Sequence, residues 1–143
     1  IYSLPKQPGN YVANYKSTFN VMGLITGATF MESEKLVVLC GYTTILQPFI
    51  YLLYDFRDND FFSGNKRKIP LNLSFHQIEG IATEDGLKYF ISGEYFSYST
   101  VTVPQKLHMI DLTEYLHNYL NNIPEKRKKN KKNFLMLSTL FYR

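Results

Sequence analysis

The sequence repeats itself at a long period. The segment Gly-Leu-Ile-Thr-Gly-Ala-Thr at 23–29, followed by the apolar run at 35–42, recurs in looser form at 77–83 and 87–94. The two copies lie about 50 residues apart, a period typical of four-stranded propeller blades. Because each repeated unit must bury its apolar face against a neighbour, this spacing says more about architecture than about activity.

Further strands of each unit follow from the same alignment. Segments 48–55 and 105–111 are apolar runs that close on Asp55 and Asp111, which we assign to equivalent positions. Each of these carboxylates is expected to accept hydrogen bonds from the turn that follows it. Segment 65–71 is the expected fourth strand of the first unit.

The start of the chain reads as the end of an earlier unit, with a third strand at 1–5 and a fourth at 10–19. We therefore predict an all-β fold, an antiparallel β-propeller segment of about two to three four-stranded blades. It would comprise a partial propeller over 1–120, with the end of one blade at 1–20, a full blade at 21–72 and most of a blade at 73–112. Since propellers close with about 4 to 8 blades, we expect the sequence to belong to a longer chain or a larger complex.

Composition fits a β protein. Hydrophobic residues make up 45% of the chain and aromatic residues 16%, with twelve Tyr and eleven Phe, which is too apolar for general disorder. The aromatic residues lie in short runs beside Val, Ile and Thr, a pattern typical of strands. The sequence contains no run of about 18 apolar residues, so we expect no transmembrane segment.

Residues 113–143 depart from the repeat. A short helix is expected with Thr113 as its cap and one apolar face formed by Leu112, Tyr115, Leu116, Tyr119 and Leu120. Segment 125–132 carries six basic residues, more than the net charge of +4 of the whole chain. This tail is either a solvated extension or an electrostatic contact with nucleic acid or an anionic envelope surface; no specific nucleic acid partner is expected. The apolar segment 134–141 is too short to span a bilayer.

Cysteine and histidine give little support for a metal site. Cys40 is the only cysteine, which excludes an intrachain disulfide and a cysteine metal cluster, and its apolar surroundings predict a buried thiol. His76, His108 and His117 are scattered, without the spacing of zinc ligands.

The candidate site residues follow from the architecture. If the first strand of each blade lines a channel, then Thr26, His76 and Glu79 point toward its axis and Glu94 joins them at the mouth. These four are the candidate ligand-binding residues, and Glu79 and Glu94 are the only weak catalytic candidates. Two converging carboxylates can hold calcium or act as acid and base. In the structural interpretation, Glu79 bonds backbone amides near the axis and Glu94 is a solvated turn residue.

Several segments carry a family resemblance. Segments 20–28, 48–56, 61–69 and 76–82 resemble a group of secreted or surface-attached propeller-like proteins from Bacteroidetes, especially flavobacteria. Members look like cargo of the type 9 secretion system or lipoproteins, and their activity is mostly undefined. The likeness covers roughly residues 1 to 120, and it implies an extracellular, cell-surface or periplasmic location. More distantly, Glu79–Ala82 with Ser92–Glu94 is similar to phytase-like esterase and SdiA-regulated propellers.

Two functions remain open. The first is a non-catalytic secreted or cell-surface propeller domain that binds a protein, glycan or envelope component, without a cofactor, alone or as a subunit of a larger surface assembly. The alternative is a calcium-dependent, phytase-like or esterase propeller hydrolase in which Glu79 and Glu94 hold the metal or act as acid and base. We favour the first, since no motif for catalysis accompanies the two carboxylates.

Overall fold

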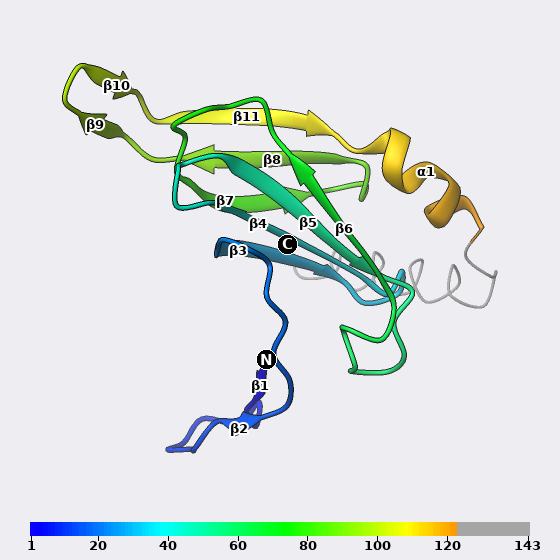
Figure 1. Ribbon diagram of the computed structural model, residues 1–143. Helices are drawn as coiled ribbons and strands as arrows, with labels where there is room; N and C mark the ends of the chain where they lie inside the picture. Colours follow the sequence, from blue (N-terminus) through cyan, green and yellow to red (C-terminus); the bar gives the residue numbers. More distant parts are fainter. Residues whose placement is uncertain (123–143) are drawn as a thin grey trace, which may run out of the picture.

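The computed structural model describes residues 1–122, which form two larger antiparallel sheets, short strand pairs and one helix (Figure 1). The first sheet has the strand order β3-β4-β5-β6. Its strands are β3 (Leu24–Met31), β4 (Leu36–Tyr42), β5 (Pro48–Tyr54) and β6 (Asn65–Pro70). The second sheet has the order β7-β8-β11. Its strands are β7 (Ile78–Thr83), β8 (Lys88–Gly93) and β11 (Lys106–Asp111).

Four short strands and a helix complete the described part. At the N-terminus, β1 (Tyr2–Ser3) pairs antiparallel with β2 (Asn14–Tyr15). A hairpin of β9 (Phe96–Tyr98) and β10 (Val101–Val103) is inserted between β8 and β11. The helix α1 (Thr113–Asn121) follows β11. Figure 1 shows the β9–β10 hairpin and α1 at opposite ends of the second sheet, and the β1–β2 pair set apart from both larger sheets.

The strands of the two larger sheets pair in equivalent registers, so residues of β3, β4 and β5 have counterparts in β7, β8 and β11. In the first, Val38 of β4 lies opposite Leu52 of β5; in the second, Phe90 of β8 lies opposite Met109 of β11. We call the face that carries Val38 the front face of the first sheet, and the face that carries its counterpart Phe90 the front face of the second. The opposite faces are the back faces.

The main core lies between the front face of the first sheet and the back face of the second. Burying each large apolar side chain there is worth roughly 1.5–3 kcal/mol, so this contact holds the two sheets together. The buried residues are Leu36, Val38, Cys40, Ile50, Leu52 and Ile69 from the first sheet, Ile78, Tyr89 and Ile91 from the second, and Leu112 and Leu116 at the helix.

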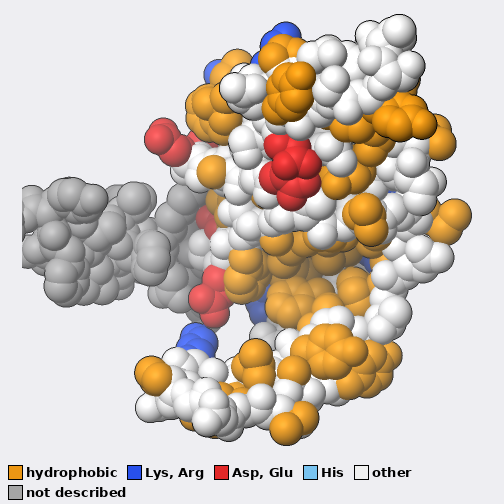
Figure 2. Space-filling model, turned by 90° about the vertical axis from the view of Figure 1, so that its left-hand side faces the viewer, with side chains coloured by type: hydrophobic (Ala, Val, Ile, Leu, Met, Phe, Trp, Pro, Cys, Tyr) orange, Lys and Arg blue, Asp and Glu red, His pale blue; other side chains and the backbone are white. Residues whose placement is uncertain are grey.

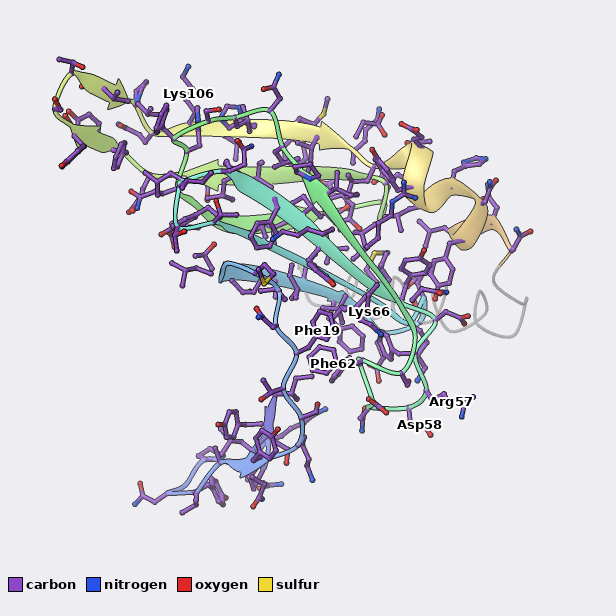
Figure 3. The ribbon with its side chains drawn as sticks, viewed as in Figure 1. Phe19, Arg57, Asp58, Phe62, Lys66 and Lys106 are labelled. Carbon is purple, nitrogen blue, oxygen red and sulfur yellow. The ribbon has the colours of Figure 1, made fainter. Side chains whose placement is uncertain are left out.

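A second apolar cluster covers the back face of the first sheet. Phe49, Tyr51 and Leu53 of β5 are buried there. Residues from the preceding segment and from the β5–β6 loop pack on them, namely Val21, Phe61 and Phe62. Figure 3 shows Phe19 beside Phe62, with Lys66 close by; the two ring centroids are 5.3 Å apart and the Lys66 ammonium lies 5.7 Å from the Phe19 centroid.

The helix joins the ends of both sheets. The Tyr119 hydroxyl donates to the Glu34 carbonyl and accepts from the Asp55 amide at 3.1 Å. The predicted cap was wrong: the N-cap position is Leu112, which has no side-chain cap bond, and the carboxylate of the preceding Asp111 bonds the first helical amide. Its Oδ1 accepts from the Thr113 amide at 2.8 Å, which confirms its predicted bond to the following turn. Hydrogen bonding to the Thr113 side chain, and then to this amide, lowers the pKa of Asp111.

The assigned equivalence of Asp55 and Asp111 is off by one residue. Asp111 lies opposite Lys88, at the place where Tyr54 lies opposite Leu36. The amides that close the two ladders belong to Asp55 and Leu112, which bond the carbonyls of Lys35 and Leu87. Both third strands are apolar runs ending near an aspartate, so residue type alone did not fix the register.

The structure confirms a mostly β chain with a short helix near residue 120, and the apolar helix face packs on the core as predicted. The predicted N-terminal strands are much shorter than expected, and the β9–β10 hairpin was not predicted. Within residues 1–122 the sheets do not close into a ring, so the propeller is taken up below as a proposal. No helix in the described part is long and apolar enough to cross a membrane. The basic and apolar tail segments lie outside the described residues.

Candidate functional site

Two of the predicted residues occupy matching irregularities in the sheets. Thr26 falls at a register shift in β3, between Ile25 and Gly27. Glu79 falls at the corresponding shift in β7, between Ile78 and Gly80. Bulges are common beside functional sites because the extra residue re-aims its side chain. The repeat therefore places a threonine and a glutamate at the same special position.

Thr26 joins the two sheets. Its hydroxyl contacts the Ile78 carbonyl of β7 and, at 3.5 Å, the Cys40 carbonyl of β4. Close backbone approach makes this possible, because a Cβ at Gly27 would lie 2.8 Å from the Cys40 sulfur and 3.2 Å from the Glu79 carbonyl. Both hydrogen bonds of Thr26 are internal, so its role in the described structure is structural.

Glu79 instead lies at the surface. Its Oε1 accepts a hydrogen bond from the Tyr42 hydroxyl at 3.5 Å, and that hydroxyl accepts one from the Gln77 side-chain amide, also at 3.5 Å. Glu94 is tied to the same place, since its amide donates to the Gln77 carbonyl at 3.0 Å. Tyr42, Gln77, Glu79 and Glu94 thus form one group, which we call the tyrosine–glutamate cluster.

The charges of the cluster act on its tyrosine. The pKa of Tyr42 is raised first by burial, and then by the negative charges of Glu79 and Glu94. Both carboxylates therefore lie within electrostatic reach of one hydroxyl, and both are exposed. Figure 2, which faces this side of the molecule, shows acidic side chains set among apolar ones.

Exposed apolar side chains surround the same strand ends. Ile45 lies in the β4–β5 turn, Phe75 in the β6–β7 connection and Tyr95 directly after Glu94, and they are 78%, 45% and 59% exposed. The Phe75 amide donates to the Leu46 carbonyl at 2.9 Å, which holds two of these connections together. The site thus combines negative charge with apolar and aromatic contact surface.

His76 does not contact the cluster through a hydrogen bond; it pairs with a histidine that the sequence left unconnected. The rings of His76 and His108 meet edge to face with centroids 5.1 Å apart. His76 Nδ1 lies 3.1 Å from the Ser74 carbonyl, whereas both Nε2 atoms are buried without a hydrogen-bond partner among the described residues. Burial, then His76 and Lys106, lower the pKa of His108. No sequence signal pairs these residues, because His76 lies in the β6–β7 connection and His108 lies within β11, 32 positions further along the chain.

Cys40 and the cations of β6 make contacts within the chain. Cys40 is buried, as predicted, and burial raises the pKa of its thiol. The cations of β6 lie over rings: Arg67 is 4.4 Å from the Tyr115 centroid and Lys68 3.9 Å from that of Phe49. Within residues 1–122, no three His, Cys, Asp or Glu side chains are grouped to hold a metal ion.

Comparison with known proteins adds no relative. No protein-family model, curated protein or solved structure matches this chain.

Proposed function

We propose that this chain is a non-catalytic binding domain built from propeller-type repeats, and that the tyrosine–glutamate cluster contacts a cationic segment of a protein partner. The observation that carries the proposal is the contrast between equivalent bulge residues. Thr26 is used internally, whereas Glu79 is exposed beside Tyr42 and Glu94. The second sheet thus has a charged, accessible side chain at the position where the first sheet has a residue that bonds only within the chain.

The chemistry of the cluster favours a lysine or arginine side chain. Two exposed carboxylates near one hydroxyl attract a cation, and exposed aromatic rings nearby can accept the apolar stem and the charge of such a side chain. The resemblance of segments such as 76–82 to secreted propeller-like proteins supports placing this contact at the cell surface or envelope, within a larger surface assembly.

The hydrolase alternative has no observation in its favour. Glu79 and Glu94 are exposed, and Glu79 accepts from a tyrosine rather than lying beside a base or nucleophile. The sequence hypothesis that they hold calcium is left as an alternative, which a calcium titration followed by unfolding temperature would test.

The binding function is tested with an oligolysine peptide, titrated into the protein by calorimetry at low salt. We expect binding that weakens as salt rises, because exposed charges are screened. Glu79→Gln and Glu94→Gln should each weaken it about 5-fold, equivalent to about 1 kcal/mol.

Glu84→Gln provides the matched control, since Glu84 is an exposed glutamate at the other end of β7. An equal loss of affinity in this variant would show non-specific attraction and contradict the proposed site. Binding of a neutral oligosaccharide in place of oligolysine would replace the proposed protein partner by a glycan.

A further inference from the structure

The front face of the second sheet is exposed although its counterpart is core. In the first sheet, Val38, Ile50 and Leu52 are each 0% exposed. Their ladder equivalents in the second sheet are Phe90, Leu107 and Met109, at 42%, 70% and 59%. The same positions are apolar in both sheets, but only the first has a sheet packed on them.

The first sheet has an exposed apolar strip on its opposite side. Ala28 and Phe30 of β3 pair with Leu39 and Val37, which pack on the back-face cluster. Phe30 is 50% exposed and Ala28 is also exposed, and Ile25, which pairs with Gly41 on this strand, is 40% exposed. Figure 2 shows that apolar side chains also line the hollow between the sheets and the N-terminal segment.

These two surfaces correspond in part to a contact that the chain already makes once. Ile25 and Ala28 are the ladder equivalents of Ile78 and Ile81, which pack in the core, whereas Val37 and Leu39, the equivalents of Tyr89 and Ile91, are already covered by the back-face cluster, so only the β3 part of this face is open. Inside the molecule, a front face receives a back face, and β3 lies beside β7: a Cβ at Gly27 would be 3.4 Å from Gly80 Cα. Each copy of the chain offers one more front face and one more back strip. A second copy therefore carries the surface that each exposed face lacks.

We propose that copies of this chain associate head to tail, the front face of the second sheet in one copy docking on the β3 back strip of the next. This rests on the propeller-type repeat of the proposed function, and it extends that repeat between molecules. Because the two surfaces differ, each added copy leaves one of each exposed, and association continues until a ring closes.

Sedimentation velocity over a range of protein concentrations tests the proposal. We expect the wild-type chain to form species larger than a dimer as concentration rises. Leu107→Glu on the front face and Ala28→Glu on the back strip should each abolish this growth. Both positions are exposed, so the variants should keep their unfolding temperatures; Ile25→Glu provides a second back-strip variant.

Mixing the two variants gives the sharpest readout. Each retains one intact surface, so an equimolar mixture of Leu107→Glu and Ala28→Glu should form a dimer and stop there. Tyr98→Glu, at the 75% exposed hairpin tip and outside both surfaces, should associate like wild type.

A wild-type chain that stays monomeric at all concentrations overturns the proposal. So does an Ala28→Glu variant that still dimerises alone, which would show front-to-front packing. Oligolysine binding by a monomeric chain would leave the binding function standing while self-docking fails, so the two failures are distinguishable.

Discussion

The two larger sheets have the same strand pairing but differ in which of their faces are buried. The first buries both faces of β5, while the second buries only the face that meets the first. At the matching bulges, one sheet has an internally bonded threonine and the other an exposed glutamate. Backbone pattern and side-chain environment are thus separable: the repeat sets the strands, and the neighbouring sheet decides whether a position is core or surface.

The largest difference in stability is expected between alanine substitutions at the equivalent positions Leu52 and Met109. Leu52→Ala leaves a cavity between the sheets and should lower the free energy of unfolding by about 2–5 kcal/mol. Met109→Ala, at the exposed equivalent, should cost below about 1 kcal/mol. Urea denaturation followed by circular dichroism measures both, and equal losses would show that the second front face is covered in solution.

Substitutions of the two bulge residues should differ less in their effect on stability. Thr26→Val removes a hydroxyl that bonds the Ile78 carbonyl, and the acceptor left without its partner should cost about 1–3 kcal/mol. Glu79→Gln should change stability by no more than about 0.5 kcal/mol. A strongly destabilised Glu79→Gln protein would assign this glutamate a structural role and remove the contrast.

The histidine pair predicts that the stability of the protein depends on pH through a group of the second sheet. Burial, His76 and Lys106 lower the pKa of His108, so the unfolded chain takes up a proton before the folded one. Stability should therefore be level above about pH 6.5 and fall as the pH drops below it, until the folded pKa is passed.

Thermal unfolding at a series of pH values checks this slope. His108→Gln should flatten it, whereas His117→Gln, which alters an exposed histidine of α1, should leave it intact. A slope that survives His108→Gln would trace the effect to other groups.

The smallest effect is expected at Tyr42. Burial, and then the charges of Glu79 and Glu94, raise the pKa of its hydroxyl, so Glu79→Gln and Glu94→Gln should each move that pKa part of the way down toward its ordinary value. NMR-monitored titration of the Tyr42 ring, assigned with a Tyr42→Phe variant, measures the shift. An unchanged pKa in both variants would mean that the carboxylates do not face this hydroxyl in solution.

The sequence predicted the positions of the main strands better than their exact register and the short elements between them. The paired segments at 35–42 and 48–55 are strands that lie side by side, because apolar runs with turn residues between them favour hairpins. Asp55 was assigned one residue out of register, since a side-chain pattern of period 2 does not reveal which residue closes the ladder. The β9–β10 hairpin, at 96–103, is short and mostly exposed, so it lacks a strong apolar signal.

The candidate site was predicted in part. Alignment of the repeats matched Thr26 with Glu79, and the structure places both at bulges. It brings Glu94 near Glu79 through Tyr42, a residue that no motif singled out. The contact between His76 and His108 depends on how β11 returns beside β8 after an inserted hairpin, which residue spacing does not encode.

The burial of Cys40 makes its thiol a probe of the separation of the two sheets. It is the only cysteine in the chain and is 0% exposed where β3 approaches β7. An alkylating reagent can reach its sulfur only when that contact opens, so under fast reclosing the rate of labelling reports the fraction of molecules in which the two sheets are apart. The native thiol thus provides, without any substitution in the chain, a measure of how firmly one repeat holds the next.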